Sequence, residues 1–165
     1  MGVNKDRGVF DYSVPVNVDA VLYPGNAVSL NSSGEAIIYP GSGVLFGLNL
    51  TDKNSYRNQC WGEFGSWGAN KVNVVKKGYV TIEPNTYDLT TGDGTTTIYP
   101  YDITATYAVN DRVYANASGQ ITNSTDLIVT ELINGVSQMT NYAGRVIVPP
   151  SSANGYKMTL DLNID

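Results

Sequence analysis

Alternating hydrophobic and polar positions run through most of this chain and predict strands. The clearest example is residues 156–164 (YKMTLDLNI), in which every second residue is apolar. A period of two is typical of a strand with one buried face. Related patterns predict strands at residues 14–18, 27–30, 35–39, 44–50, 71–82, 112–115, 120–122 and 143–148. Within the longest of these segments, Lys76-Lys77-Gly78 predicts a turn.

One phrase of the sequence occurs twice. Residues 28–37 read VSLNSSGEAI, and residues 113–121, which begin 85 positions later, read VYANASGQI. Each copy predicts a β-hairpin, because Asn and Gly tolerate the backbone angles of a tight turn. A strand with a glycine among aliphatic residues follows each hairpin, and a closing strand comes next. This order predicts two similar halves, about 21–82 and 105–165, that bury a core together; the alternative is that any β protein reuses the same turn residues.

Three segments lie outside the repeated pattern and predict other structures. Residues 1–20 predict an extended N-terminal arm, and residues 51–70 are a polar and aromatic insertion. Residues 84–104 are rich in Thr and Gly and predict a protruding hairpin, since they contain an Asp-Gly pair suited to a tight turn. Residues 127–135 fit a helical turn and a strand equally well.

The composition supports an all-β fold. The chain has 165 residues, of which 12 are Tyr, 17 are Gly and 7 are Pro. Tyr, Val, Ile and Thr favour strands, whereas Gly and Pro favour turns. We therefore expect an arm at 1–20 and one domain at 21–165, a small β-barrel or β-sandwich built from two similar hairpin-containing halves.

The charge and the distribution of apolar residues argue against binding to nucleic acid and against a membrane-spanning helix. The net charge is −5 with only 10 Lys and Arg, whereas nucleic-acid binding normally needs a basic patch. No apolar run approaches the ~20 residues of a membrane-spanning helix. The N-terminus lacks the apolar centre of a signal peptide, so we expect a protein made and used in a cytosol.

The residues that usually carry chemistry are scarce. The chain has no His, and its one Cys, Cys60, cannot form a zinc site alone. Its aspartates lie mostly in turns, where they commonly bond to the backbone. We therefore expect no enzymatic activity, no catalytic residue, no metal and no cofactor.

The insertion carries an aromatic cluster, made of Tyr56, Trp61, Phe64 and Trp67. Three interpretations remain open. The cluster caps the end of the barrel, forms a protein interface, where Trp and Tyr are enriched, or stacks on sugar rings.

Several stretches resemble one family. TYAVNDRVYANASGQIT followed by AGRVIVPPSS and a closing strand is similar to the head decoration, or cement, proteins of tailed bacteriophages. LYPGNAVSLNSSGEAI followed by LFGLNLTD and VNVVKKGYVTI resembles the same pattern again. The insertion at 51–70 and the predicted hairpin at 84–104 depart from the short family form.

The resemblance implies a non-enzymatic virion protein. Such a protein assembles in the host cytoplasm and binds the outer surface of the capsid, where it stabilises contacts between major capsid protein subunits, often as a trimer. Two other functions stay open: another virion structural role, as a head fibre or a tail or baseplate component, and carbohydrate binding through Trp61 and Trp67.

The candidate contact residues are apolar side chains on segments that the two halves do not need for their own core. We expect the 14–18 stretch to add as a strand to a neighbour's sheet, with Pro15 suited to an edge position. The candidate interface residues are Val9, Phe10, Tyr12, Val14, Tyr56, Trp61 and Trp67.

Overall fold

The fold is almost entirely β, which confirms the expected class. The computed structural model describes residues 3–5, 10–17, 20–50, 52–54, 59–61, 71–86 and 97–165. The main sheet contains β1 (Val3–Lys5), β2 (Phe10–Pro15), β3 (Ala27–Leu30), β4 (Ala36–Ile38), β5 (Gly47–Asn49), β8 (Lys71–Ile82), β9 (Arg112–Ala115), β10 (Ile121–Thr122), β13 (Tyr142–Val148) and β14 (Met158–Asn163). Smaller elements are the pairs β6 (Asp52–Asn54) with β7 (Gln59–Trp61) and β11 (Thr130–Ile133) with β12 (Val136–Met139), and the 3₁₀ turns η1 (Thr125–Leu127) and η2 (Ser152–Asn154).

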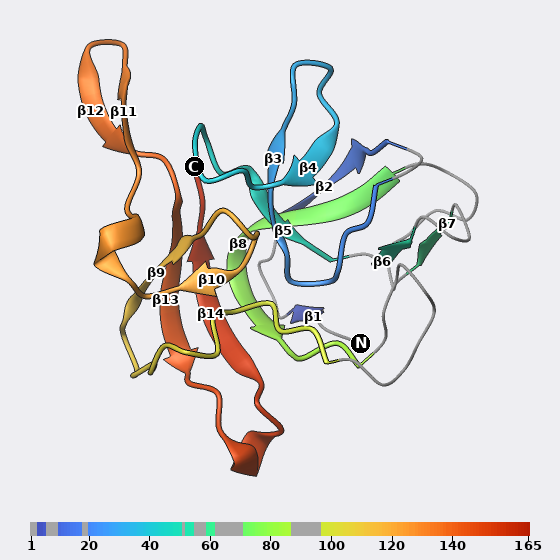
Figure 1. The fold of residues 1–165 in the computed structure, drawn as a ribbon, viewed down its shortest axis with the longest axis vertical. Helices are drawn as coiled ribbons and strands as arrows, with labels where there is room; N and C mark the ends of the chain where they lie inside the picture. Colours follow the sequence, from blue (N-terminus) through green and yellow to red (C-terminus); the bar gives the residue numbers. More distant parts are fainter. Residues whose placement is uncertain are drawn as a thin grey trace.

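The main sheet has the same arrangement when followed from either end. Its strand order is β10-β9-β13-β14-β8-β5-β3-β4, and all neighbours are antiparallel. Each half therefore contributes a hairpin, a glycine-containing strand and a closing strand, and the closing strands β8 and β14 pair at the centre (Figure 1). The sheet curls, and the backbone N–H of Ala27 in one half donates to the carbonyl of Gly119 in the other at 2.8 Å.

The two copies of the repeated phrase form matching hydrogen bonds. The side-chain Oδ1 of Asn31 accepts from the backbone N–H groups two and four positions later, at 2.9 and 3.0 Å. Asn116 makes the same two bonds at the same distances. The preceding turns also match, because Asn26 and Asp111 each accept from the N–H three positions earlier at 2.8 Å.

Strand registers extend the match beyond the turns. Val28 of β3 faces Gly47 of β5, and Val113 of β9 faces Gly144 of β13. Equivalent positions are 85 residues apart at the two valines and 97 apart at the two glycines. The second half is therefore longer between these points, and the β11–β12 hairpin lies in that interval.

Replacing either turn asparagine tests this equivalence. Asn31→Ala and Asn116→Ala should each lower the free energy of unfolding by about 1–2 kcal/mol, because two backbone N–H groups lose their acceptor. Urea denaturation measures both values. Asn31→Asp and Asn116→Asp keep the acceptor oxygen and should cost less; a turn that tolerates Ala without loss would contradict the equivalence.

Strand β8 is one continuous bent strand, so the turn expected at Lys76-Lys77-Gly78 is wrong. Phe10 faces Lys77 while Asp11 faces Val75, which leaves Lys76 as the extra residue of a β-bulge. Gly78 has a φ of 108°. A bulge followed by a left-handed glycine bends a strand without ending it. The first part of β8 consequently pairs with β2 and β5, and its last part with β1 and β14.

Two apolar clusters pack against β8. The larger includes Val75, Val80 and Ile82 of β8 together with residues of both halves. The smaller includes Val72 and Val74. Because the adjacent residues Val74 and Val75 belong to different clusters, this part of β8 is buried on both faces.

The N-terminal strands extend the chain's own sheet. Both β1 and β2 pair with β8 of the same chain. Val14 is only 5% exposed and packs with Val16 and Leu22 in the smaller cluster. The exposure expected for Val14 is therefore wrong, because its side chain serves the chain's own core.

The other two predicted segments are described in part. The ends of the predicted protruding hairpin meet in an antiparallel bridge between Asn85 and Ile98, with bonds of 2.8 and 2.7 Å; residues 87–96 lie outside the described residues. Within residues 127–135, the strand alternative is the observed one, as β11.

Candidate protein-binding face

The β11–β12 hairpin projects from the body of the protein (Figure 1). Its strands are joined by Asn134 and Gly135, which have φ values of 52° and 77°. Positive φ at both central residues is the geometry of the tight two-residue turn that fixes hairpin register. The hairpin is therefore a defined structure although it has no core of its own.

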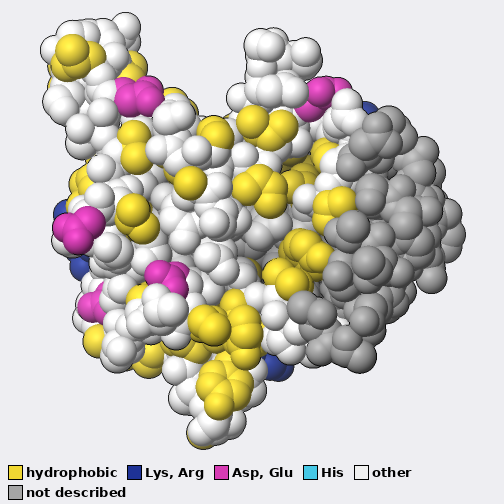
Figure 2. All heavy atoms as spheres, viewed as in Figure 1, with side chains coloured by type: hydrophobic (Ala, Val, Ile, Leu, Met, Phe, Trp, Pro, Cys, Tyr) yellow, Lys and Arg dark blue, Asp and Glu magenta, His cyan; other side chains and the backbone are white. Residues whose placement is uncertain are grey.

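The hairpin exposes apolar side chains. Leu132 is 77% exposed, Val136 is 59% exposed and Met139 is also exposed. In Figure 2 the hairpin is the prominence at the upper left, with apolar side chains on it. Apolar side chains gathered on a protruding element are typical of a surface that another protein covers.

Asn141 fixes the base of the hairpin. It is fully buried, and its Nδ2 donates to the carbonyls of Ala115 (3.0 Å) and Leu127 (2.8 Å). Its Oδ1 accepts from the N–H of Val129 at 2.9 Å. Three bonds from one buried side chain thus hold the segments on both sides of the hairpin to β9.

The hairpin is also tied to the loop between β4 and β5. The Oε1 of Glu131 accepts from the backbone N–H of Gly43 at 2.8 Å. Beneath this loop, Tyr39 is fully buried. Burial, and to a smaller extent the charge of Glu131, raise the pKa of the Tyr39 hydroxyl, so this position is uncharged at neutral pH.

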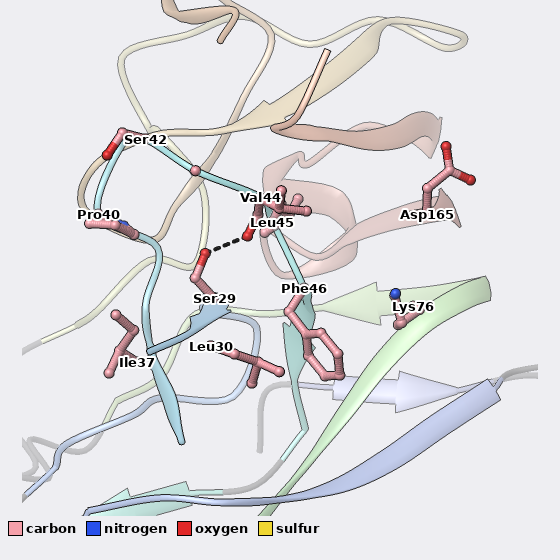
Figure 3. A pocket seen from close by; sticks show the side chains of 11 residues that line it. Ser29, Leu30, Ile37, Pro40, Ser42, Val44, Leu45, Phe46, Lys76 and Asp165 are labelled. Atoms are coloured by element: carbon pink, nitrogen blue, oxygen red, sulfur yellow. Dashed lines mark hydrogen bonds between the residues drawn. The ribbon is translucent and has the colours of Figure 1, made fainter. Parts of the chain in front are cut away.

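The same loop borders an apolar groove with a volume of about 430 Å³. Its walls come from the β3–β4 hairpin, the β4–β5 loop and β8. Figure 3 shows the lining residues Ser29, Leu30, Ile37, Pro40, Ser42, Gly43, Val44, Leu45, Phe46, Lys76 and Asp165. Ser29 Oγ donates to the Val44 carbonyl at 2.6 Å and holds the loop against β3, with the Val44 side chain 51% exposed.

One end of the groove carries charge beside aromatic rings. The Nζ of Lys76 lies 4.9 Å from the ring centre of Phe46 and 5.9 Å from that of Tyr12. The two rings meet edge to face at 5.9 Å. Figure 3 places Asp165 near the same end. A partner would therefore meet an apolar floor with both charge signs at its margin.

The arrangement is suited to binding. Within the described residues, no three His, Cys, Asp or Glu side chains come together as metal ligands would. The groove lining includes two ionisable side chains, Lys76 and Asp165. This face presents the apolar β11–β12 hairpin next to the apolar groove, and both are supported by the main sheet.

The structure places the candidate interface residues in different surroundings. Val9, Tyr56 and Trp67 lie outside the described residues, and Phe10 and Trp61 are described only as members of β2 and β7. Tyr12 is 49% exposed and contacts the groove through Phe46, whereas Val14 is buried.

Sequence reasoning missed the hairpin as a candidate contact element. The signal was present, since an Asn-Gly pair stands between two apolar residues in Ile133-Asn134-Gly135-Val136. This is a strong local hairpin pattern. The projection of the hairpin depends on the longer second half of the chain, and no local sequence pattern indicates it.

The chain matches no protein-family model, no curated protein and no solved structure. Among the described residues, no helix has the length and apolar character needed to cross a bilayer.

Proposed function

We propose that this chain is a head decoration, or cement, protein of a tailed bacteriophage. It binds the outer surface of the assembled capsid and stabilises contacts between major capsid protein subunits. The observation that carries the proposal is the exposed apolar hairpin beside an apolar groove on one rigid β body. The resemblance of both halves to this family supplies the identity of the partner.

The physical requirements of a clamp agree with these features. A clamp needs a body that does not deform, and here the closing strands of both halves pair at the centre of one sheet. It also needs apolar side chains that lose water when the partner binds, because removing apolar surface from water is the main favourable term in most protein–protein association. Leu132 and Val136 are such residues, since both are more than half exposed in the isolated chain.

The proposal includes an assembly and a place. The protein is made in the host cytoplasm and joins the virion at junctions between major capsid protein subunits, with three copies to a junction. Other virion positions, at the base of a head fibre or in the tail or baseplate, are separated from this one by electron microscopy of virions that carry a labelled chain.

A double substitution on the hairpin tests the contact. Leu132→Ser with Val136→Thr should weaken binding to capsids assembled without the protein by about tenfold or more, because apolar surface buried at the contact is lost. Co-sedimentation at a series of protein concentrations measures the affinity. Thermal unfolding should change little, since substitutions at exposed sites usually alter stability by about 0.5 kcal/mol or less.

Val109→Thr is the matched control. Val109 is 58% exposed, close to the 59% of Val136, but lies in the loop before β9. It should leave capsid binding unchanged. Failure of the unsubstituted protein to sediment with capsids would refute the proposed function; equal binding by the double variant would remove the hairpin from it.

A further inference from the structure

A second hollow, of about 350 Å³, has tyrosines as half of its lining residues. Its lining residues are Tyr99, Tyr101, Ile103, Ala105, Pro150 and Tyr156. Figure 2 shows apolar side chains gathered towards the lower end of the molecule, the end that carries η2 in Figure 1. The hollow is separate from the hairpin and groove, and the proposed function does not use it.

Tyr156 is held in an unfavourable backbone conformation. Its φ is 59°, a left-handed value that residues with a side chain seldom adopt. Its N–H donates to the Ser151 carbonyl at 2.8 Å, and its own carbonyl accepts from Tyr101 Oη at 2.7 Å. The ring is nevertheless 50% exposed. The loop therefore holds the backbone of Tyr156 in a strained conformation although its ring contributes little to the core. Such backbone strain is typical of functional positions.

The hollow has a rigid aromatic wall. Tyr101 is 3% exposed and meets Tyr99 edge to face at 5.8 Å and Tyr107 at 5.9 Å. Burial raises the pKa of Tyr101 to about 12, with smaller contributions from Tyr99 and Tyr156. The Tyr101 hydroxyl therefore stays protonated and keeps its bond to the Tyr156 carbonyl.

The polar side-chain groups at the rim are tyrosine hydroxyls. Among the described residues, neither Tyr99 nor Tyr156 uses its hydroxyl in a hydrogen bond to another residue. The lining includes no Asp, Glu, Lys or Arg side chain. The charged residues that follow Tyr101 and Tyr156 in the chain have partners: Lys157 pairs with Glu83 at 3.2 Å, and Asp102 accepts from Thr104.

We propose that this hollow binds the ring of a neutral pyranose sugar. The C–H face of a pyranose packs on an aromatic ring, whose face is electron-rich. Sugar hydroxyls both donate and accept, as tyrosine hydroxyls do. An uncharged lining fits a neutral hexose and disfavours a uronic acid, whose carboxylate would lose water without gaining a cation.

A proline-rich peptide is the other ligand that aromatic hollows commonly take. Its prolines lack an N–H, so it offers mainly carbonyl acceptors. Such a peptide would use only the donor capacity of Tyr99 and Tyr156. The observations therefore favour the sugar.

Binding to defined oligosaccharides tests the proposal. The probes are maltotriose, cellotriose and chitotriose, with a galacturonic acid trimer as the charged comparator, measured by saturation-transfer NMR and calorimetry. At least one neutral trimer should bind, and the charged trimer should not. Tyr156→Ala should weaken binding about tenfold through loss of the stacked ring, whereas Tyr156→Phe should weaken it about threefold.

Two control variants distinguish a sugar site from nonspecific binding to exposed tyrosines and from capsid binding. Tyr79→Ala removes a tyrosine that is 49% exposed on β8 and should leave sugar binding unchanged. The Leu132→Ser, Val136→Thr variant should also retain it. The proposal is overturned if no neutral trimer binds, if Tyr79→Ala causes the same loss as Tyr156→Ala, or if a proline decamer binds in place of the sugars.

Discussion

Gly144→Ala should lower the free energy of unfolding by about 3 kcal/mol, the upper end of the usual range for overpacking. Gly144 lies in β13 between β9 and β14. An added Cβ would collide with the carbonyl oxygen of Asp161 and would lie 3.0 Å from both the carbonyl carbon of Asp161 and the Cα of Leu162. All three are backbone atoms of the facing strand, so no side-chain rotation relieves the contact. Urea denaturation with an unchanged dependence on urea concentration gives the value.

The comparison variant for this prediction is Gly34→Ala. Gly34 has a φ of 76° and no heavy atom within 4 Å of an added Cβ. Only backbone strain applies there, about 1 kcal/mol. Gly47, the counterpart of Gly144, would meet Val74 and Val75, so Gly47→Ala should resemble Gly144→Ala. Equal losses for Gly144→Ala and Gly34→Ala would show that close strand approach is unimportant.

Asn141→Ala should also cost about 3 kcal/mol, because three hydrogen bonds disappear and buried groups lose their partners. The affected groups are the carbonyls of Ala115 and Leu127 and the N–H of Val129. Since Leu127 and Val129 precede β11 and Asn141 follows β12, faster amide hydrogen exchange is expected in both strands of the hairpin. Exchange mass spectrometry together with urea denaturation measures both effects.

Gln138→Ala is the control for Asn141→Ala. Gln138 is exposed on β12, and its replacement should leave stability and exchange nearly unchanged. If Asn141→Ala lowers stability while exchange in the hairpin stays as in the unsubstituted protein, Asn141 serves the core and does not anchor the hairpin.

Local turn chemistry made the two hairpins predictable from the sequence. Asn31 and Asn116 satisfy neighbouring backbone groups, so the information lies within a few residues. The turn predicted at Gly78 is wrong because a glycine serves a tight turn and a bulged strand equally well. Only the registers of β2 and β14 on either side of β8 decide between them.

Nonlocal features were beyond the reach of sequence patterns. The alternation of apolar and polar residues correctly predicts that Val14 lies in a strand. It does not indicate which apolar side chains cover Val14. The tyrosine hollow joins Tyr101 to Tyr156, which are 55 positions apart. No periodicity connects positions so distant, and the contact depends on how the curled sheet brings two loops together.

The mirrored strand order has a consequence for the asymmetry of the protein's surface. Two identical half-length chains, paired through their closing strands, would give the same order of strands. Once both copies reside in one polypeptide, each is free to diverge separately. The projecting β11–β12 hairpin belongs to the C-terminal half, while most residues of the adjoining apolar groove come from the N-terminal half. Two joined halves can therefore build an asymmetric surface, which a symmetric pair of identical chains cannot.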